Sequence, residues 1–100
     1  MRGEAKPQLL GMIDERIKEL AREIARQRSL IQTLKFQKAE AGGRGDVQIG
    51  YSLSSAQLEM EQSARRLGYL RILQQRVRGG EIETREQLEE ELRVIDLKTI

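Results

Sequence analysis

The side chains in this sequence that could carry chemistry are arginines, lysines and carboxylates, because the chain contains no cysteine and no histidine. This composition excludes disulfides, thiol nucleophiles, Cys/His zinc sites and imidazole acid–base catalysis. Cations that could contact nucleic-acid phosphates gather on two segments, as Arg22, Arg26, Arg28, Arg65, Arg66, Arg71, Arg76 and Arg78. Carboxylates are interleaved with the first group, and no aromatic platform accompanies either. The pattern favours a solvated, salt-bridged face, and nucleic-acid binding is not expected.

A glycine-containing segment supplies two further motifs. Gly42 and Gly43 are not followed by the Lys-Ser/Thr of a phosphate-binding loop, nor is a strand predicted before them. The Arg44-Gly45-Asp46 tripeptide spells an adhesion motif, but a turn in which Asp46 accepts a hydrogen bond from a nearby backbone N–H is expected instead. The sequence therefore predicts no catalytic, cofactor-binding or metal-ligating residue and no small-molecule substrate.

Long helices must position these charged side chains. Charged residues make up 34 % of the chain and aromatic residues 3 %, a mixture typical of coiled coils that excludes a β-sandwich or a doubly wound sheet. Periodicity predicts a first helix over about residues 8–41, with Pro7 in its first turn. Its apolar positions recur mostly at spacings of three and four, with Gln27 as one polar step: Leu10, Ile13, Ile17, Leu20, Ile24, Ile31 and Leu34.

The second helix is predicted over about residues 54–78, after a loop spanning 42–53. Ser54 and Gln57 have the spacing of a capping box, and Leu53 and Leu58 that of a hydrophobic staple. Within the loop, Val47, Ile49 and Tyr51 alternate with polar or small residues, which favours a short extended piece. Gly79 and Gly80 are predicted to end the helix.

A third helix is predicted over about residues 84–97. Thr84 and Gln87 form another capping box, and Leu88, Leu92 and Ile95 share one face. Residues 81–100 carry three basic and seven acidic side chains, whereas residues 1–80 carry an excess of basic ones. We therefore expect the segment to fold back onto the basic body, with its apolar face contributing more than the charges.

The predicted fold class is all-α, one domain over residues 1–100: an antiparallel, coiled-coil-like hairpin of long helices with a short third helix at its C-terminal end. The side chains predicted to pack the hairpin are Ile13, Ile17, Leu20, Ile24, Ile31, Leu34, Met60, Leu67, Leu70 and Val77. The sequence lacks an apolar run long enough to cross a membrane, and its start lacks the apolar core of a signal peptide. We expect a cytoplasmic protein that does not contact membranes.

The apolar stripe is broader than a two-helix seam requires. Residues off the main line are Leu9, Met12, Leu30, Phe36, Leu58, Ile72 and Leu73. The third helix is expected to cover only the end of the hairpin near residues 8–25 and 70–78. An outer protein interface is predicted at Leu30, Phe36, Tyr69 and Ile72, with a homo-oligomer or a protein partner as its occupant.

The stretch from about residue 30 to 73 resembles short helical-hairpin segments found beside effector or ATPase domains in bacterial signalling and conflict-system proteins. The resemblance lies in Leu34, Gln37 and Ala39 before the turn, and in the run Leu67-Gly68-Tyr69-Leu70. It implies an adaptor or oligomerisation role with no active site. The prediction is accordingly a non-enzymatic helical interaction module without a cofactor.

Three alternatives stay open, and binding of a nucleic acid by the arginines is one of them. Ile13-Asp14 in a long first helix, with Arg28 and Lys38 beyond it, resembles the all-helical chorismate mutases, which implies a small enzyme whose cations bind a dicarboxylate. Gly45-Asp46 and Tyr51 near the tip of a hairpin resemble the transcript-cleavage factors, which implies binding to RNA polymerase. The segment after Asp46 lacks the second carboxylate with which that family holds a metal.

Overall fold

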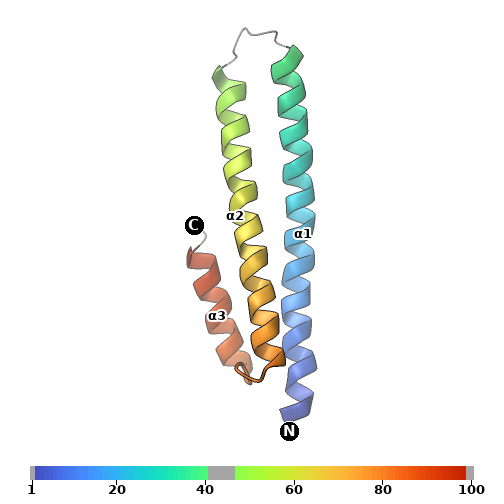
Figure 1. Cartoon of the computed structure of the whole chain (residues 1–100), viewed down its shortest axis with the longest axis vertical. Coiled ribbons are helices and arrows are strands. Elements are labelled where there is room, and N and C mark those ends of the chain that lie inside the picture. Colours follow the sequence, from blue (N-terminus) through green and yellow to red (C-terminus); the bar gives the residue numbers. More distant parts are fainter. Residues whose placement is uncertain (1, 41–46, 99–100) are drawn as a thin grey trace.

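Three helices account for most of the chain in a computed structural model, which describes residues 2–40 and 47–98 and, in the first helix, side chains from Lys6 onward. They are α1 (Arg2–Glu40), α2 (Val47–Arg78) and α3 (Arg85–Lys98). α1 and α2 run antiparallel along the whole molecule, and α3 folds back beside the lower half of α2 (Figure 1). The molecule measures 64 × 20 × 15 Å. The all-α hairpin with a short third helix is thus confirmed, and the described residues include no strand.

The lower half is a three-helix arrangement with the larger core. Its buried side chains come from all three helices and from the connection before α3: Leu9, Ile13, Leu20, Leu70, Leu73, Val77, Ile82, Leu88, Leu92 and Ile95. Ile17, Ile24 and Leu67 pack against this cluster and are partly buried. The short third helix therefore covers the end of the hairpin where the sequence predicts it.

The upper half is a two-helix arrangement with a smaller core. Ile31 from α1 packs with Leu53 and Ala56 from α2, and Leu34 and Met60 lie against them. Along α1 the two cores are separated by Gln27, and along α2 by the buried Ser63. The side-chain oxygen of Gln27 is buried and accepts no hydrogen bond from the described residues. A polar layer thus divides the hairpin at mid-height.

Two predicted helix starts are wrong. α1 begins at Arg2 rather than near residue 8, so Pro7 lies inside the helix, beyond the first turn. α2 begins at Val47, so the predicted cap at Ser54 and the extended segment around Tyr51 are both helical. Continuing α2 toward the turn places Leu53 within the helix, where it is buried in the upper core with Ile31, and this burial outweighs the local capping preference. Arg44-Gly45-Asp46 and the rest of 41–46 lie outside the described residues.

Backbone geometry ends α2 at the predicted glycines. Gly80 has φ of +83°, a conformation that favours glycine because it has no Cβ. The Gly80 N–H donates to the Val77 carbonyl at 3.1 Å, and the Glu81 N–H donates to the Arg76 carbonyl at 2.9 Å. These two bonds form a Schellman motif. Lys6 Nζ donates to the Arg78 carbonyl at 3.0 Å, so α1 also caps the end of α2.

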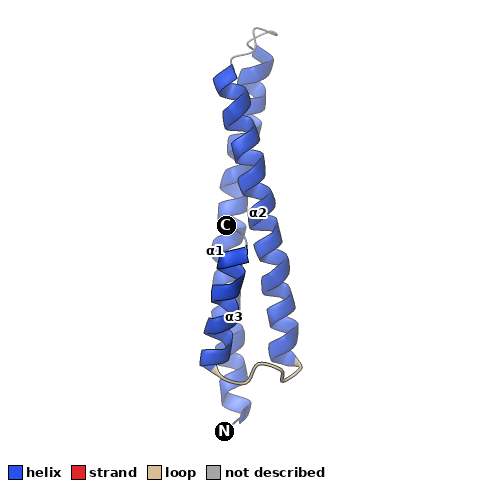
Figure 2. Ribbon diagram, turned by 90° about the vertical axis from the view of Figure 1, so that its left-hand side faces the viewer, coloured by secondary structure: helices blue, strands red, loops and turns tan. Residues whose placement is uncertain are grey.

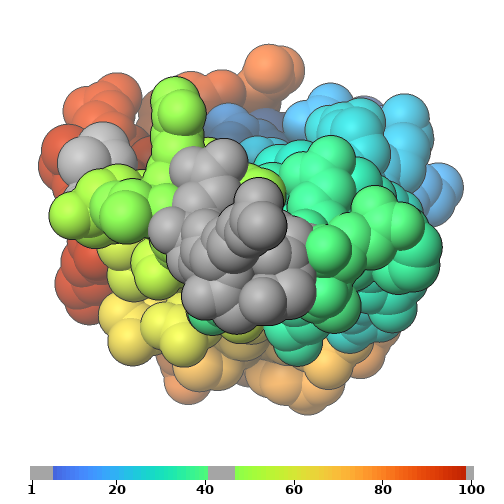
Figure 3. Space-filling model, turned by 90° about the horizontal axis from the view of Figure 1, so that it is seen from above, coloured from blue at the N-terminus to red at the C-terminus, as the bar shows by residue number. Residues whose placement is uncertain are grey.

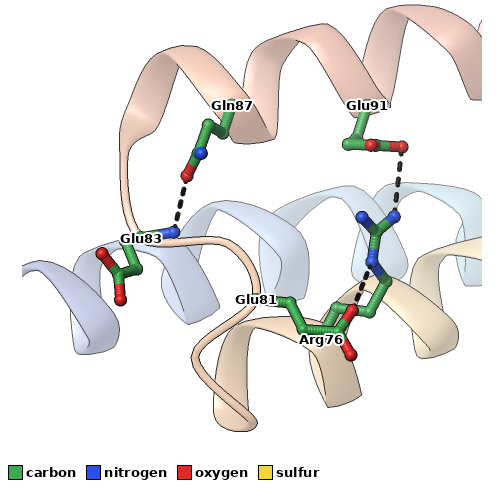
Figure 4. A network of polar contacts seen from close by, with 5 residues as sticks. All are labelled: Arg76, Glu81, Glu83, Gln87 and Glu91. Atoms are coloured by element: carbon green, nitrogen blue, oxygen red, sulfur yellow. Dashed lines mark hydrogen bonds and ion pairs between the residues drawn. The ribbon is translucent and has the colours of Figure 1, made fainter.

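The predicted capping box at the start of α3 is confirmed. The Gln87 N–H donates to Thr84 Oγ1 at 3.2 Å, and Gln87 Oε1 accepts from the backbone N–H of Thr84 at 3.2 Å. Gln87 Oε1 also accepts from the backbone N–H of Glu83 at 2.9 Å (Figure 4). Three backbone donors that the helix cannot satisfy by itself are thereby paired.

We expect Thr84→Ala to lower the free energy of unfolding by about 1 kcal/mol, because one capping acceptor is lost. Chemical denaturation monitored by circular dichroism measures this change. Thr84→Ser keeps the hydroxyl and serves as the matched control. Equal stability of the alanine and serine variants would show that the hydroxyl contributes nothing.

Candidate interaction surface

Ion pairs connect α3 to both long helices. Arg16 of α1 lies 3.7 Å from Asp96, and Arg76 of α2 lies 3.3 Å from Glu91. Arg76 Nε also donates to Glu81 at 3.1 Å (Figure 4). One guanidinium therefore contacts both α3 and the segment that connects α2 to α3. The hydrogen bond to Glu91, and to a smaller extent the one to Glu81, raises the pKa of Arg76. Arg76 is therefore engaged in ion pairs within the fold.

The other side chains considered for chemistry are spread along the rod. Arg28 and Lys38 are both exposed, and ten residues of helix separate them by about 15 Å along α1. No cluster of three or more potential metal ligands occurs among the described residues. A shallow hollow between α1 and α3, lined by both acidic and basic side chains, includes Arg16, Glu19 and Asp96.

Exposed apolar side chains are concentrated on α2. On this helix, Val47, Tyr51, Leu58, Tyr69 and Ile72 are exposed. Tyr51 and Leu58 are seven residues apart, and Ile72 follows Leu58 by two further sevens. Seven residues are close to two helical turns, so these three side chains lie nearly in line on one face. We call Tyr51, Leu58, Arg65 and Ile72 the α2 row.

The α2 row lies away from the hairpin seam. The side chains of α2 that pack in the cores include Leu53, Met60 and Leu67, each two residues after a member of the row. Residues two apart point about 200° away from each other on a helix. In Figure 2, α1 and α3 lie on one side of the lower half of α2, and the other side is uncovered. The middle of α2 likewise reaches the molecular surface in the end-on view (Figure 3).

The apolar side chains of the row are largely exposed. Tyr51 is 73 % exposed, Leu58 57 % and Ile72 56 %. Burying a side chain of this size is worth roughly 1.5 to 3 kcal/mol. The fold leaves more than half of each of these side chains exposed, so a second surface that covered the row would gain the remaining part of this energy.

The four residues predicted for an outer interface are all exposed, but they do not form one patch. Tyr69 and Ile72 are neighbours at i, i+3 on α2, and the Lys98 ammonium lies 5.8 Å from the centre of the Tyr69 ring. Leu30 lines a shallow groove between α1 and α2 together with Tyr51 and Ala56. Phe36 is six residues beyond Leu30 on α1, which turns it about 120° away from Leu30.

Tyr51 and Leu58 are the surface residues that sequence reasoning assigned to other roles. Tyr51 was expected in an extended segment and Leu58 in a hydrophobic staple, so their alignment with Ile72 did not emerge. The sequence does contain a sign of this alignment, because positions 51, 58, 65 and 72 are each seven residues apart.

No helix within the described residues is both long and apolar enough to cross a bilayer. Comparisons with protein-family models, with characterised proteins and with solved structures found no match to this chain.

Proposed function

We propose that this chain is a non-enzymatic helical interaction module that assembles through apolar side chains on the outside of its hairpin. The observation that carries the proposal is the α2 row. Large apolar side chains occupy three of its four positions, which are seven residues apart on an exposed helix face. A recurrence every seven residues places apolar side chains on one helix face, as at one of the two apolar positions of a coiled-coil heptad. An adaptor role in the cytoplasm, as the resemblance to signalling and conflict-system segments implies, belongs to this proposal.

The two cores of the hairpin contain no member of the α2 row. The seam between α1 and α2 is filled from the opposite face of α2, and α3 covers Leu73 rather than Ile72. Aligned exposed apolar side chains lower solubility unless a partner covers them, and such patches mark interaction sites. Self-association or docking to another helical protein would provide the cover.

We expect the chain to be a dimer or a larger oligomer at high micromolar concentration, in equilibrium with monomer at lower concentration. Sedimentation equilibrium over a range of loading concentrations measures this directly. A variant with Leu58→Ser and Ile72→Ser should shift the equilibrium toward monomer, because it removes apolar area from the row. Ala25→Ser on α1 is a control at an exposed position outside the row.

A wild-type chain that stays monomeric at high micromolar concentration would contradict self-association. An oligomer that resists the Leu58→Ser/Ile72→Ser substitutions would show that another surface holds the chains together.

A further inference from the structure

We infer that the surface covering the α2 row is the same row of a second copy, with the two α2 helices antiparallel and a two-fold axis near Gln62. The inference rests on the proposed interaction function and specifies its partner and geometry. Three observations carry it: the composition of the row, the charges beside it, and the position of α1 and α3.

The composition of the row selects the direction. Arg65 occupies one of the four aligned positions, between Leu58 and Ile72. Parallel pairing would bring Arg65 against Arg65 of the second copy and place like charges in the seam. Antiparallel pairing about Gln62 instead sets Tyr51 opposite Ile72 and Leu58 opposite Arg65. The aliphatic stem of Arg65 can then cover Leu58 while its guanidinium reaches water.

The charges beside the row are complementary in the same direction. Glu61 precedes Gln62 and Arg65 follows it, and both are exposed, so the exposed face at the middle of α2 changes from acidic to basic. Antiparallel pairing brings the acidic half of one copy beside the basic half of the other, twice by symmetry. Glu61 and Arg65 form no ion pair with any other described residue, so both charges are open to such a contact.

The fold leaves space for this contact. α3 stops beside Tyr69, where Lys98 lies over the ring, and in the view of Figure 2 neither α1 nor α3 lies beyond the outer side of the lower half of α2. The row extends from Tyr51 to Ile72, about 32 Å of helix at 1.5 Å per residue. A second helix can therefore follow the row along its whole length without displacing α3.

Cysteine cross-linking tests the geometry, because the natural chain has no cysteine. Single variants Tyr51→Cys, Gln62→Cys and Ile72→Cys are treated with a short bifunctional thiol reagent, with Ala25→Cys as the control outside the row. We expect Gln62→Cys chains to link to each other efficiently. Tyr51→Cys chains should not, because their thiols would lie about 32 Å apart along the axis. Mixing Tyr51→Cys with a size-tagged Ile72→Cys chain should give the mixed product.

Each alternative has its own signature. Self-linking of all three row variants would indicate parallel pairing and overturn the inference while leaving the proposed function intact. A dimer by sedimentation in which none of the three links, or only Ala25→Cys does, would place the interface elsewhere and overturn it as well. A chain that is monomeric at high micromolar concentration would overturn both the inference and the proposed self-association.

Charge reversal provides a second measurement that does not depend on thiol chemistry. Glu61→Arg and Arg65→Glu should each weaken the dimer about tenfold, because two symmetry-related contacts become repulsive. An equimolar mixture of the two variants should regain wild-type affinity as a heterodimer. Both residues are exposed, so helicity measured by circular dichroism should stay unchanged. Unchanged affinity in both single variants would overturn the charge pairing and the inferred register.

Discussion

Replacing Leu88 by alanine is expected to lower the free energy of unfolding by about 2 to 5 kcal/mol. Leu88 is 0 % exposed and lies in the lower core with residues from all three helices. Truncation there removes apolar contacts and leaves a cavity that packed neighbours fill only in part. Urea denaturation monitored by circular dichroism measures the change, at a concentration low enough to keep the chain monomeric.

Leu97→Ala is the matched control on the same helix. Leu97 is 67 % exposed, so the same chemical change should cost about 0.5 kcal/mol or less. Similar losses in the two variants would mean that α3 presents another face to the hairpin than the one described.

Ending the chain after Gly80 is expected to have the largest effect on stability. The truncated hairpin would lose the buried side chains of Ile82, Leu88, Leu92 and Ile95, and would expose the α1 and α2 residues beneath them, such as Leu9 and Leu73. Each of these four side chains contributes roughly 1.5 to 3 kcal/mol by burial, before the entropy of ordering α3 is subtracted. We expect a clearly lower melting temperature and stronger binding of a dye that detects exposed apolar surface.

The salt dependence of the melting temperature distinguishes whether apolar contacts or ion pairs hold α3 against the hairpin. The ion pairs of Arg16 with Asp96 and of Arg76 with Glu91 involve side chains that are partly exposed, and such pairs contribute only about 0 to 1 kcal/mol each. The melting temperature of the intact chain should therefore change little between low and high salt. A truncated chain that melts at the same temperature as the intact one would show that α3 adds nothing to stability.

Much of the fold follows from local rules that the sequence states directly. The seam residues Ile13, Leu20 and Ile31 recur at helical spacing, and all three are buried. Thr84 and Gln87 start α3 because their side chains satisfy backbone donors within three residues. Helical periodicity and helix caps depend on residues close together in the sequence, so they can be predicted without knowledge of the tertiary structure.

The start of α2 could not be obtained in this way, because two signals conflict there. Ser54 offers a favourable local cap, but its value of about 1 kcal/mol is smaller than the roughly 1.5 to 3 kcal/mol gained by burying Leu53, which precedes that cap. That gain exists only if α1 presents Ile31 at the same height, which is a property of the folded hairpin.

The candidate surface was partly predictable for a related reason. Leu73 and Ile72 are adjacent and both lie off the main heptad line, yet Leu73 is buried and Ile72 is exposed. Periodicity indicates that extra apolar residues exist but does not say which of them α3 covers. Only the path of the chain through Gly79 and Gly80, which directs α3 to one side of α2, separates the two sets.

The polar layer at Gln27 and Ser63 has a consequence for hydrogen exchange. Because Ile31, Leu53 and Ala56 form a core separate from the one that α3 completes, the turn-proximal half of the hairpin can open while the lower half stays folded. Backbone amides above the layer would then exchange with solvent through partial opening, and those below it only through global unfolding. The rod would behave as two cooperative units of unequal stability.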